Sequence, residues 1–343
     1  MKKDQLNNWY NKRKERKSSL NFDSLVLGIK NGDFSSLASA ITILESTNMS
    51  DIEVARKMIN HLVPFSGNSI RIGITGVPGV GKSTFIEKFG LLALERGYKL
   101  AVLAIDPSSE KSRGSILGDK TRMNQLAAAK NVFIRPSASG ETLGGVARKT
   151  RESIILCEAA GYDLILVETV GVGQSEIAVH SMVDFFMLLM LSGAGDELQG
   201  IKRGIMEMAD SLIITKADGE NQENAKRASQ SYKNAFHLFP SNSNGWTPEV
   251  FTCSAQADFN ISRVLNMIER YVISTKENES FIKKRATQNN YWLKETIKDH
   301  LISSFYSDPQ ILSELHKAEI AIQKGILSPF EAAEKLLGMK NKS

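Results

Sequence analysis

A glycine-rich segment near residue 80 has the residue types and spacing that bind a polyphosphate. The run "GITGVPGVGKSTF", residues 73–85, matches Gly-x-x-x-x-Gly-Lys-Ser. In such a loop backbone N–H groups surround the phosphates, the lysine reaches the β- and γ-phosphates, and the serine hydroxyl binds Mg²⁺. The segment stands between a strand pattern and a helix pattern, as this chemistry requires. We expect the phosphates to be bound by Gly76, Val77, Pro78, Gly79, Val80, Gly81, Lys82, Ser83 and Thr84.

Three carboxylates could complete a magnesium site with Ser83. "LILVETVG" ends an apolar run with Glu168, and Gly171 three residues later can offer its N–H to the γ-phosphate. Asp106 in "AIDPSS" also ends an apolar run, and Asp119 lies in "GSILGDKTRM". Oxygen ligands of this kind suit Mg²⁺, although a helix cap is the alternative for both aspartates.

The spacing of these motifs predicts how their strands are arranged. Between Ser83 and Glu168 the chain has room for two further strand–helix units. We therefore expect the strand of Glu168 to run parallel to the first strand and to be separated from it by another strand.

A later motif indicates which base is bound. "IITKADG" ends an apolar run, and the Asp218 carboxylate can accept from both the ring N–H and the exocyclic amine of guanine. Adenine has no matching pair of donors and would leave a buried carboxylate unpaired. We expect the stem of Lys216 to lie along the base, and a backbone N–H of "CSA", with Ser254 and Ala255, to meet the guanine carbonyl. Thr215 replaces the asparagine of the usual Asn-Lys-x-Asp motif and removes an amide that braces the pocket.

The pattern of the whole chain predicts an α/β fold with a mostly parallel central sheet, the fold of a P-loop NTPase. Apolar runs alternate with helical stretches, which indicates a sheet covered on both faces. We expect a helical N-terminal extension over 1–66, a GTPase domain over 67–275 and a helical arm over 276–343. The predicted strands cover 69–75, 99–106, 132–136, 163–169, 184–191, 211–216 and 249–255.

Composition and charge exclude several classes of function. The chain has 343 residues, 42% of them hydrophobic, and a net charge of +5. Residues 1–18 alone carry that excess, so the rest lacks the basic face that nucleic acid needs. The longest apolar run has seven residues, too short for a bilayer, and two separated cysteines suit a reducing compartment. We expect a cytoplasmic protein without membrane or nucleic-acid partners. The five scattered histidines do not suggest a nickel or zinc site.

Six motifs together resemble a known family. They are "GVPGVGKST", "AIDPSS", "GSILGDKTRM", "ETVGVGQSE", "GAGDELQGIK" and "TKADG". Over about residues 21–338 the chain resembles the MeaB/ArgK-type GTPases of the SIMIBI class, chaperones of adenosylcobalamin-dependent methylmalonyl-CoA mutase. The resemblance implies GTP/GDP and Mg²⁺ as ligands and a homodimer formed through the C-terminal arm. It implies GTP hydrolysis coupled to cobalamin loading and protection of the mutase, with Ser83, Asp106, Asp119 and Glu168 as metal and switch residues.

The resemblance also implies a third switch, from Gly193 to Lys202. Val172 follows Gly171 where Ras-like enzymes have a water-orienting glutamine, so we expect slow intrinsic hydrolysis that a bound mutase accelerates. Lys202 is the candidate trigger, three residues after Gln199, and an exposed helix residue is the alternative. Arg113 and Ser192 depart from the family pattern beside switch segments.

The residues leave other readings open. The phosphate loop permits a small-molecule kinase, although no acceptor pocket can be recognised. A non-catalytic interaction protein is disfavoured by the intact set of Lys82, Ser83 and Glu168. The client could be methylmalonyl-CoA mutase or a related acyl-CoA mutase.

Overall fold

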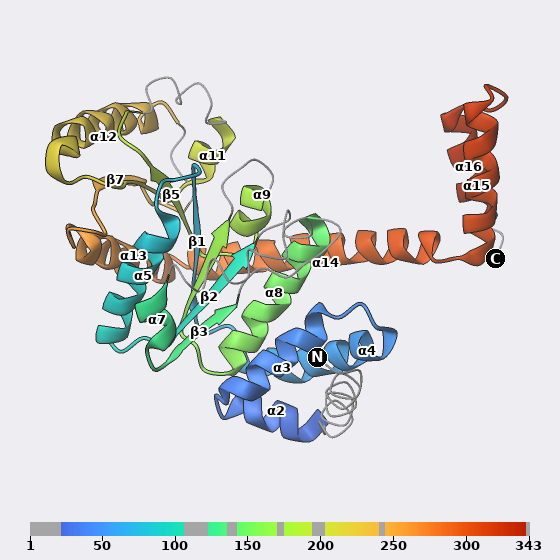
Figure 1. The fold of residues 1–343 in the computed structure, drawn as a ribbon, viewed down its shortest axis with the longest axis horizontal. Coiled ribbons are helices and arrows are strands. Elements are labelled where there is room, and N and C mark those ends of the chain that lie inside the picture. Colours follow the sequence, from blue (N-terminus) through green and yellow to red (C-terminus); the bar gives the residue numbers. More distant parts are fainter. Residues whose placement is uncertain are drawn as a thin grey trace, which may run out of the picture. The chain divides into compact units, whose positions relative to one another are not determined.

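Seven strands form one parallel sheet at the centre of the protein's larger compact unit (Figure 1). The computed structural model describes residues 22–105, 123–135, 143–169, 175–193, 203–239 and 244–340. The strands are β1 (Ile70–Gly76), β2 (Leu100–Ile105), β3 (Val132–Arg135), β4 (Leu164–Thr169), β5 (Phe185–Met190), β6 (Ser211–Ile214) and β7 (Glu249–Thr252). Their order is β3-β2-β4-β1-β5-β6-β7, and every pairing is parallel. The predicted fold class and all seven predicted strands are confirmed.

Helices cover both faces of the sheet, which explains why its strands are apolar throughout. On one face, Ile72 and Ile74 of β1 share a core with Phe85 and Phe89 of α5 (Lys82–Glu95) and with α13 (Ile261–Glu277). On the other, Leu212 and neighbours pack on α11 (Arg203–Met208) and α12 (Gln222–Phe236), and α8 (Leu143–Ala159) and α9 (Ser175–His180) cover β2, β4 and β1. The shorter elements are α7 (Asn124–Ala128), η1 (Val63–Phe65) and η2 (Gly219–Asn221).

The position of the Glu168 strand differs from the prediction. Its direction is confirmed as parallel, but β4 pairs directly with β1, with Ile74 opposite Glu168, so no strand separates them. The two intervening units place β2 and β3 outside β4 instead. The four-residue β3 takes the edge, while the apolar β4 takes a central position where both of its edges are paired. The length of the connection between β1 and β4 permits either strand order, so it could not predict which strand lies beside β1.

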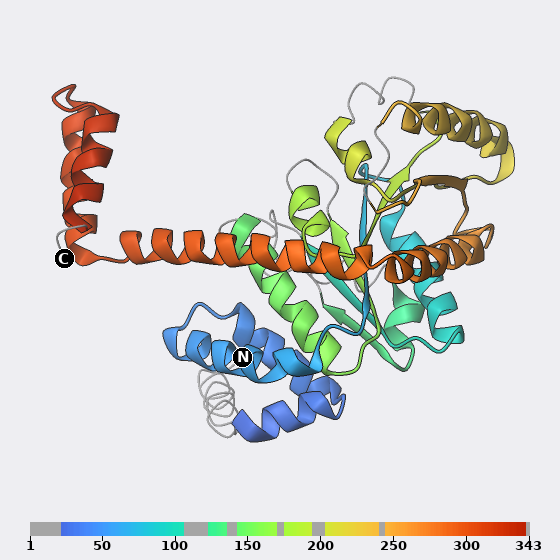
Figure 2. The same ribbon diagram turned by 180° about the vertical axis from the view of Figure 1, so that it is seen from behind.

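The N-terminal helices form a layer behind α8. They are α2 (Phe22–Lys30), α3 (Phe34–Glu45) and α4 (Met49–Leu62), and all three contact α8, which itself contacts β2 (Figure 2). Polar contacts of α3 join its end to the sheet layer: Arg135 Nε of β3 donates to Glu45 Oε1 at 3.1 Å, and Lys149 Nζ of α8 donates to the Glu45 carbonyl at 2.7 Å. Helices are thus present over 22–62 of the predicted N-terminal extension, and its residues 1–21 lie outside the described residues.

The second compact unit, Ala286–Ser343, is helical where it is described. It contains most of α14 (Ser280–Tyr306), followed by α15 (Pro309–Gln323) and α16 (Pro329–Lys340), which pack on each other. Asp308 caps α15 by accepting from the N–H of Gln310 at 2.8 Å. Among the described residues, no helix is both long and apolar enough to cross a bilayer.

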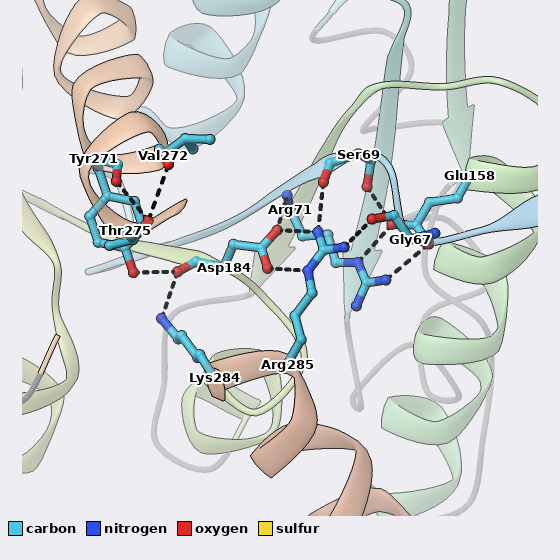
Figure 3. A network of polar contacts seen from close by, with 10 residues as sticks. All are labelled: Gly67, Ser69, Arg71, Glu158, Asp184, Tyr271, Val272, Thr275, Lys284 and Arg285. Carbon is cyan, nitrogen blue, oxygen red and sulfur yellow. Dashed lines mark hydrogen bonds and ion pairs between the residues drawn. The ribbon is translucent and has the colours of Figure 1, made fainter. Parts of the chain in front are cut away.

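A buried polar network joins the amino-terminal end of the sheet to the first turns of α14 (Figure 3). Arg285 donates from Nε to Asp184 Oδ1 and from Nη2 to Asp184 Oδ2, both at 2.7 Å, and Nη2 also donates to the Ser69 carbonyl at 2.6 Å. Asp184 Oδ2 accepts from the N–H of Arg71 at 2.8 Å. The Lys284 ammonium donates to the Asp184 carbonyl at 2.6 Å.

The network continues from β1 to the end of α8. Arg71 donates from Nε and Nη2 to the two oxygens of Glu158, at 2.8 and 2.9 Å, and the Ser69 hydroxyl donates to Glu158 Oε1 at 2.5 Å. Burial raises the pKa of Glu158, but the hydrogen bonds and charge of Arg71 outweigh it, and the pKa lies below its usual value. Every charge in this pair is therefore matched, which a buried ion pair requires.

Candidate functional site

The phosphate loop follows β1 at the carboxyl end of the sheet, where β1 lies between β4 and β5. This is the position at which open parallel sheets bind ligands. Gly76 has φ 156°, and a Cβ there would stand 2.4 Å from the Leu189 carbonyl oxygen of β5. Gly81, with φ 90°, lies in the left-handed region directly before α5. Both positions therefore require glycine.

Lys82 is folded back onto the loop in which it stands. Its ammonium donates to the carbonyl of Gly76 at 2.9 Å and to that of Val77 at 3.5 Å. Burial lowers the pKa of Lys82, and the carboxylates of Glu168 and Glu176 act in the opposite direction. Among the described residues its partners are these two carbonyls, and a desolvated ammonium can exchange such weak partners for phosphate oxygens.

The residues predicted to bind the metal are described only in part. Ser83 lies in the first turn of α5, half-buried, and Glu168 lies on the neighbouring strand β4. Strand β1, which leads to Ser83 through the phosphate loop, ends at the same edge of the sheet as β4. On the other side of β4, Ile105, the residue before Asp106, pairs with Thr169. The other calls lie outside the described residues; they are Asp106, Asp119, Gly171, Gln199 and Lys202, together with Arg113.

The residues predicted to bind the base line one cavity. Lys216, Asp218, Ser254 and Ala255 face it together with Thr215. The other lining residues are Val80, Gly81, Thr84, Phe85, Cys253 and Gln256, so the phosphate loop forms part of the wall. The structure thus brings the phosphate loop together with two segments that lie more than a hundred residues later in the sequence.

Hydrogen bonds orient the Asp218 carboxylate in this cavity. The Ser254 hydroxyl donates to Asp218 Oδ2 and also accepts from the N–H of Ala257 at 3.0 Å. The N–H of Ala217 donates to the Cys253 carbonyl at 3.0 Å, which joins the two base-facing segments. A carboxylate held in this way presents its remaining lone pairs to a ligand with two adjacent donors, as guanine has.

Thr215, which lacks the amide of the usual asparagine, makes a different hydrogen bond to the phosphate loop. Its hydroxyl donates to the Val80 carbonyl of the phosphate loop at 2.7 Å, and it is buried. The contact joins the base-binding segment to the phosphate loop. The amide of asparagine is absent, as the sequence analysis noted, but the shorter hydroxyl of Thr215 reaches the phosphate loop.

Two further polar residues support the base-binding segment: Asn221, which the sequence analysis missed, and Ser192, which it named only as a departure from the family pattern. Asn221 Nδ2 donates to the Lys216 carbonyl at 2.7 Å, and the Ser192 hydroxyl donates to Asn221 Oδ1. Lys216 has a left-handed backbone, φ 54°, and its ammonium donates to the Gly79 carbonyl at 2.8 Å. Ser192, which departs from the family pattern, thus supports the segment that carries Lys216. In the sequence, the only signal for Ser192 was its position directly before the third switch.

Comparisons with known proteins agree with this geometry. A family model described as methylmalonyl-CoA mutase-associated GTPase MeaB matches residues 37–310. The chain is 46% identical over 319 residues to a putative GTPase of Caulobacter vibrioides, covering 93% of this chain and 98% of that protein. It is 40% identical over 301 residues to the GTPase ArgK of Escherichia coli, covering 88% and 91% of the two chains.

Two further relatives differ in the names they carry. The chain is 42% identical over 325 residues to the mitochondrial methylmalonic aciduria type A homolog of Mus musculus, covering 92% of this chain and 78% of that protein. The solved structure of an LAO/AO transport system kinase is similar with a TM-score of 0.74 and 33% identity, covering 94% and 98% of the two chains.

Proposed function

The chain belongs to the family of methylmalonyl-CoA mutase-associated GTPases and is itself a GTPase, and from this premise we propose that it serves an acyl-CoA mutase. In this proposal GTP hydrolysis gates the loading of adenosylcobalamin onto methylmalonyl-CoA mutase, or a related acyl-CoA mutase, and protects that enzyme from inactivation. The single observation that carries the nucleotide part is the cavity that Asp218 shares with the phosphate loop.

The donor set of the phosphate site fits a magnesium ion. The Ser83 hydroxyl, in the helix that follows β1, and the Glu168 carboxylate, on the strand beside β1, are hard oxygen ligands, and the half-buried Lys82 supplies a cation for the phosphates. Mg²⁺ prefers such oxygens and keeps several waters. In the proposal Asp106 and Asp119 complete the metal site, and Gly171 contacts the γ-phosphate. Bound there, the ion would neutralise charge that develops on the phosphates.

The proposal includes a trigger for hydrolysis. Val172 has an aliphatic side chain and cannot orient water, so a charge must come from elsewhere. We assign that role to Lys202, with Gln199 as its neighbour, when a client is bound. An arginine finger contributes about 10³–10⁵ in rate in other GTPases, and a lysine without a bidentate fork should contribute less.

The C-terminal arm is the proposed dimer interface. Its helices expose large apolar side chains that a monomer would leave in water: Leu301 is 62% exposed, Phe330 84% and Leu337 58%. Other exposed apolar residues of the same unit are Leu293, Ile297, Ile302, Tyr306, Leu312, Ile320, Ile326 and Met339. Exposed apolar surface of this extent is typical of an interface. Sedimentation of the full chain, compared with Leu301→Asp, tests the assignment.

GTP turnover with and without a purified acyl-CoA mutase tests the proposed function. We expect slow turnover alone, a clear increase with the mutase, and loss of that increase in Lys202→Ala with GTP binding retained. Turnover that no acyl-CoA mutase changes would contradict the client assignment. Transfer of phosphate from GTP to arginine would instead support a kinase. Unchanged stimulation in Lys202→Ala would move the trigger to Gln199, Asp119 or the client.

A further inference from the structure

Two buried polar residues at the start of α9 stand out from the site described above. Ser175 is 2% exposed and Glu176 is 1% exposed. In the described part of the chain, Ser175 Oγ and Glu176 Oε2 have no hydrogen-bond partner. A buried carboxylate with an open acceptor costs folding free energy, because water no longer solvates it. Such a group calls for an explanation in terms of a ligand or of catalysis.

A relay of hydroxyl groups connects Glu176 to the phosphate loop. The Thr169 hydroxyl donates to Thr75 Oγ1 at 2.8 Å, and the Thr75 hydroxyl donates to Glu176 Oε1 at 3.4 Å. Thr75 directly precedes Gly76, whose carbonyl accepts from Lys82. Thr169 directly follows Glu168 at the end of β4. The carboxylate is therefore attached to the ends of both strands that carry the phosphate-binding residues.

The charge of Glu176 acts on the same site. Its carboxylate raises the pKa of Lys82 against the effect of burial, as does that of Glu168. Among the described residues no salt bridge neutralises Glu176. An ordinary helix-terminus role would place the carboxylate in water near the N–H groups of α9, whereas this one is buried and bonded to Thr75.

We propose that Glu176 is a positioning residue that makes nucleotide affinity depend on a divalent cation. Its negative charge lies behind the phosphate loop, where it disfavours a bare polyphosphate and favours one that is neutralised by Mg²⁺. Thr75 and Thr169 hold the carboxylate in place. The inference rests on the GTPase activity and is independent of the client.

The isosteric variant Glu176→Gln separates charge from shape. We measure the Kd of a non-hydrolysable GTP analogue with saturating Mg²⁺ and with EDTA, for the wild type and for the variant. The ratio of the two Kd values should fall about tenfold in the variant, mainly through tighter binding without metal. The unfolding midpoint without nucleotide should stay the same or rise, since a buried charge is removed. An unchanged ratio overturns the proposal, as does an equal loss of affinity in both conditions.

The pair Thr75→Val and Thr75→Ser provides a second test that keeps the charge. Valine removes the donor to Glu176 Oε1, and serine retains it. Thr75→Val should lower the Kd ratio partly, and Thr75→Ser should keep the wild-type ratio. If Glu176→Gln does not fold, this pair decides alone, and equal ratios in the two variants contradict the proposal. A wild type that binds no GTP analogue would instead contradict the GTPase assignment, so the two failures are distinguishable.

Discussion

The two ends of the central sheet differ in how completely their buried carboxylates are hydrogen-bonded. At the amino-terminal end, Asp184 and Glu158 accept hydrogen bonds from arginines on both oxygens (Figure 3). At the carboxyl end, Lys82 is bonded only to carbonyls, and Glu176 keeps one oxygen without a partner among the described residues. The two carboxylates at the first end are therefore paired on both oxygens, whereas Glu176 at the second end retains an acceptor that no described residue uses.

This difference separates stability from function within one domain. Removing either partner of a fully paired buried charge lowers the stability of the fold, because the remaining charge is left in a low dielectric. A buried site whose polar groups are only partly paired is less stable than a fully paired one. Such sites are typical of regions that bind ligands or catalyse reactions. Variants at the amino end should therefore change unfolding, and variants at the carboxyl end should change nucleotide chemistry.

The largest effect is expected at Arg285. Arg285→Met removes both bonds to Asp184 and leaves that carboxylate buried, which should lower the free energy of unfolding by about 3–5 kcal/mol. Urea unfolding measures the loss, and the Kd for GTP of the folded variant should stay the same. Lys226→Met is the matched control: it breaks the exposed pair with Glu223 and should leave stability nearly unchanged. Equal effects of the two variants would remove the distinction between the two ends.

The next effect concerns Lys82. Lys82→Ala removes the cation that contacts the phosphates and should lower the rate of GTP hydrolysis about 10²–10³-fold. Its unfolding midpoint should be close to that of the wild type, since the ammonium is desolvated and its partners among the described residues are carbonyls. Single-turnover hydrolysis gives the rate. Turnover equal to that of the wild type would mean that the chain is not a catalyst at this loop.

The stability of the fold should also depend on pH, through His180 at the end of α9. Burial, and then the charge of Lys284, lower the pKa of His180 from 6.5 to about 4. Below pH 6.5 the unfolded chain takes up a proton that the folded chain refuses, so stability is lost as the pH falls from 6.5 to 4. The loss should reach about 3 kcal/mol at most.

Urea unfolding of the wild type and His180→Gln between pH 7 and pH 4 measures this loss. The stability advantage of the wild type over the variant should shrink as the pH falls. A constant difference between the two proteins would show that the folded chain accepts the proton as readily as the unfolded chain does.

The smallest effect is expected at Thr215. Thr215→Val keeps the shape and removes the bond to the Val80 carbonyl, which should cost about 1–2 kcal/mol, expressed mainly as weaker GTP binding. Thr215→Ser keeps the hydroxyl and serves as the control. If both variants bind GTP equally, the hydroxyl does not brace the phosphate loop.

The sequence predicted the local features well and the long-range ones poorly. The strands, the phosphate loop and the Asp218 motif could be recognised because each is encoded within about ten residues. The neighbour of β4 could not, because connection length alone does not set strand order. The bond from Thr215 to Val80 joins residues 135 apart in sequence. The ion pairs of Arg71 and Arg285 also join residues that are far apart in sequence, so the periodicity of the sequence did not predict them.

Nucleotide selectivity tests the central claim most directly, because it depends on one carboxylate at the open end of the sheet. The Kd values of GTP, ATP and xanthosine triphosphate should be measured for the wild type and Asp218→Asn. The wild type should prefer GTP to ATP by at least about 10², as two hydrogen bonds to a charged acceptor imply. The variant should lose guanine preference and gain affinity for xanthosine triphosphate, whose carbonyl accepts from the new amide. Equal binding of ATP and GTP by the wild type, or an unchanged guanine preference in Asp218→Asn, would contradict the account.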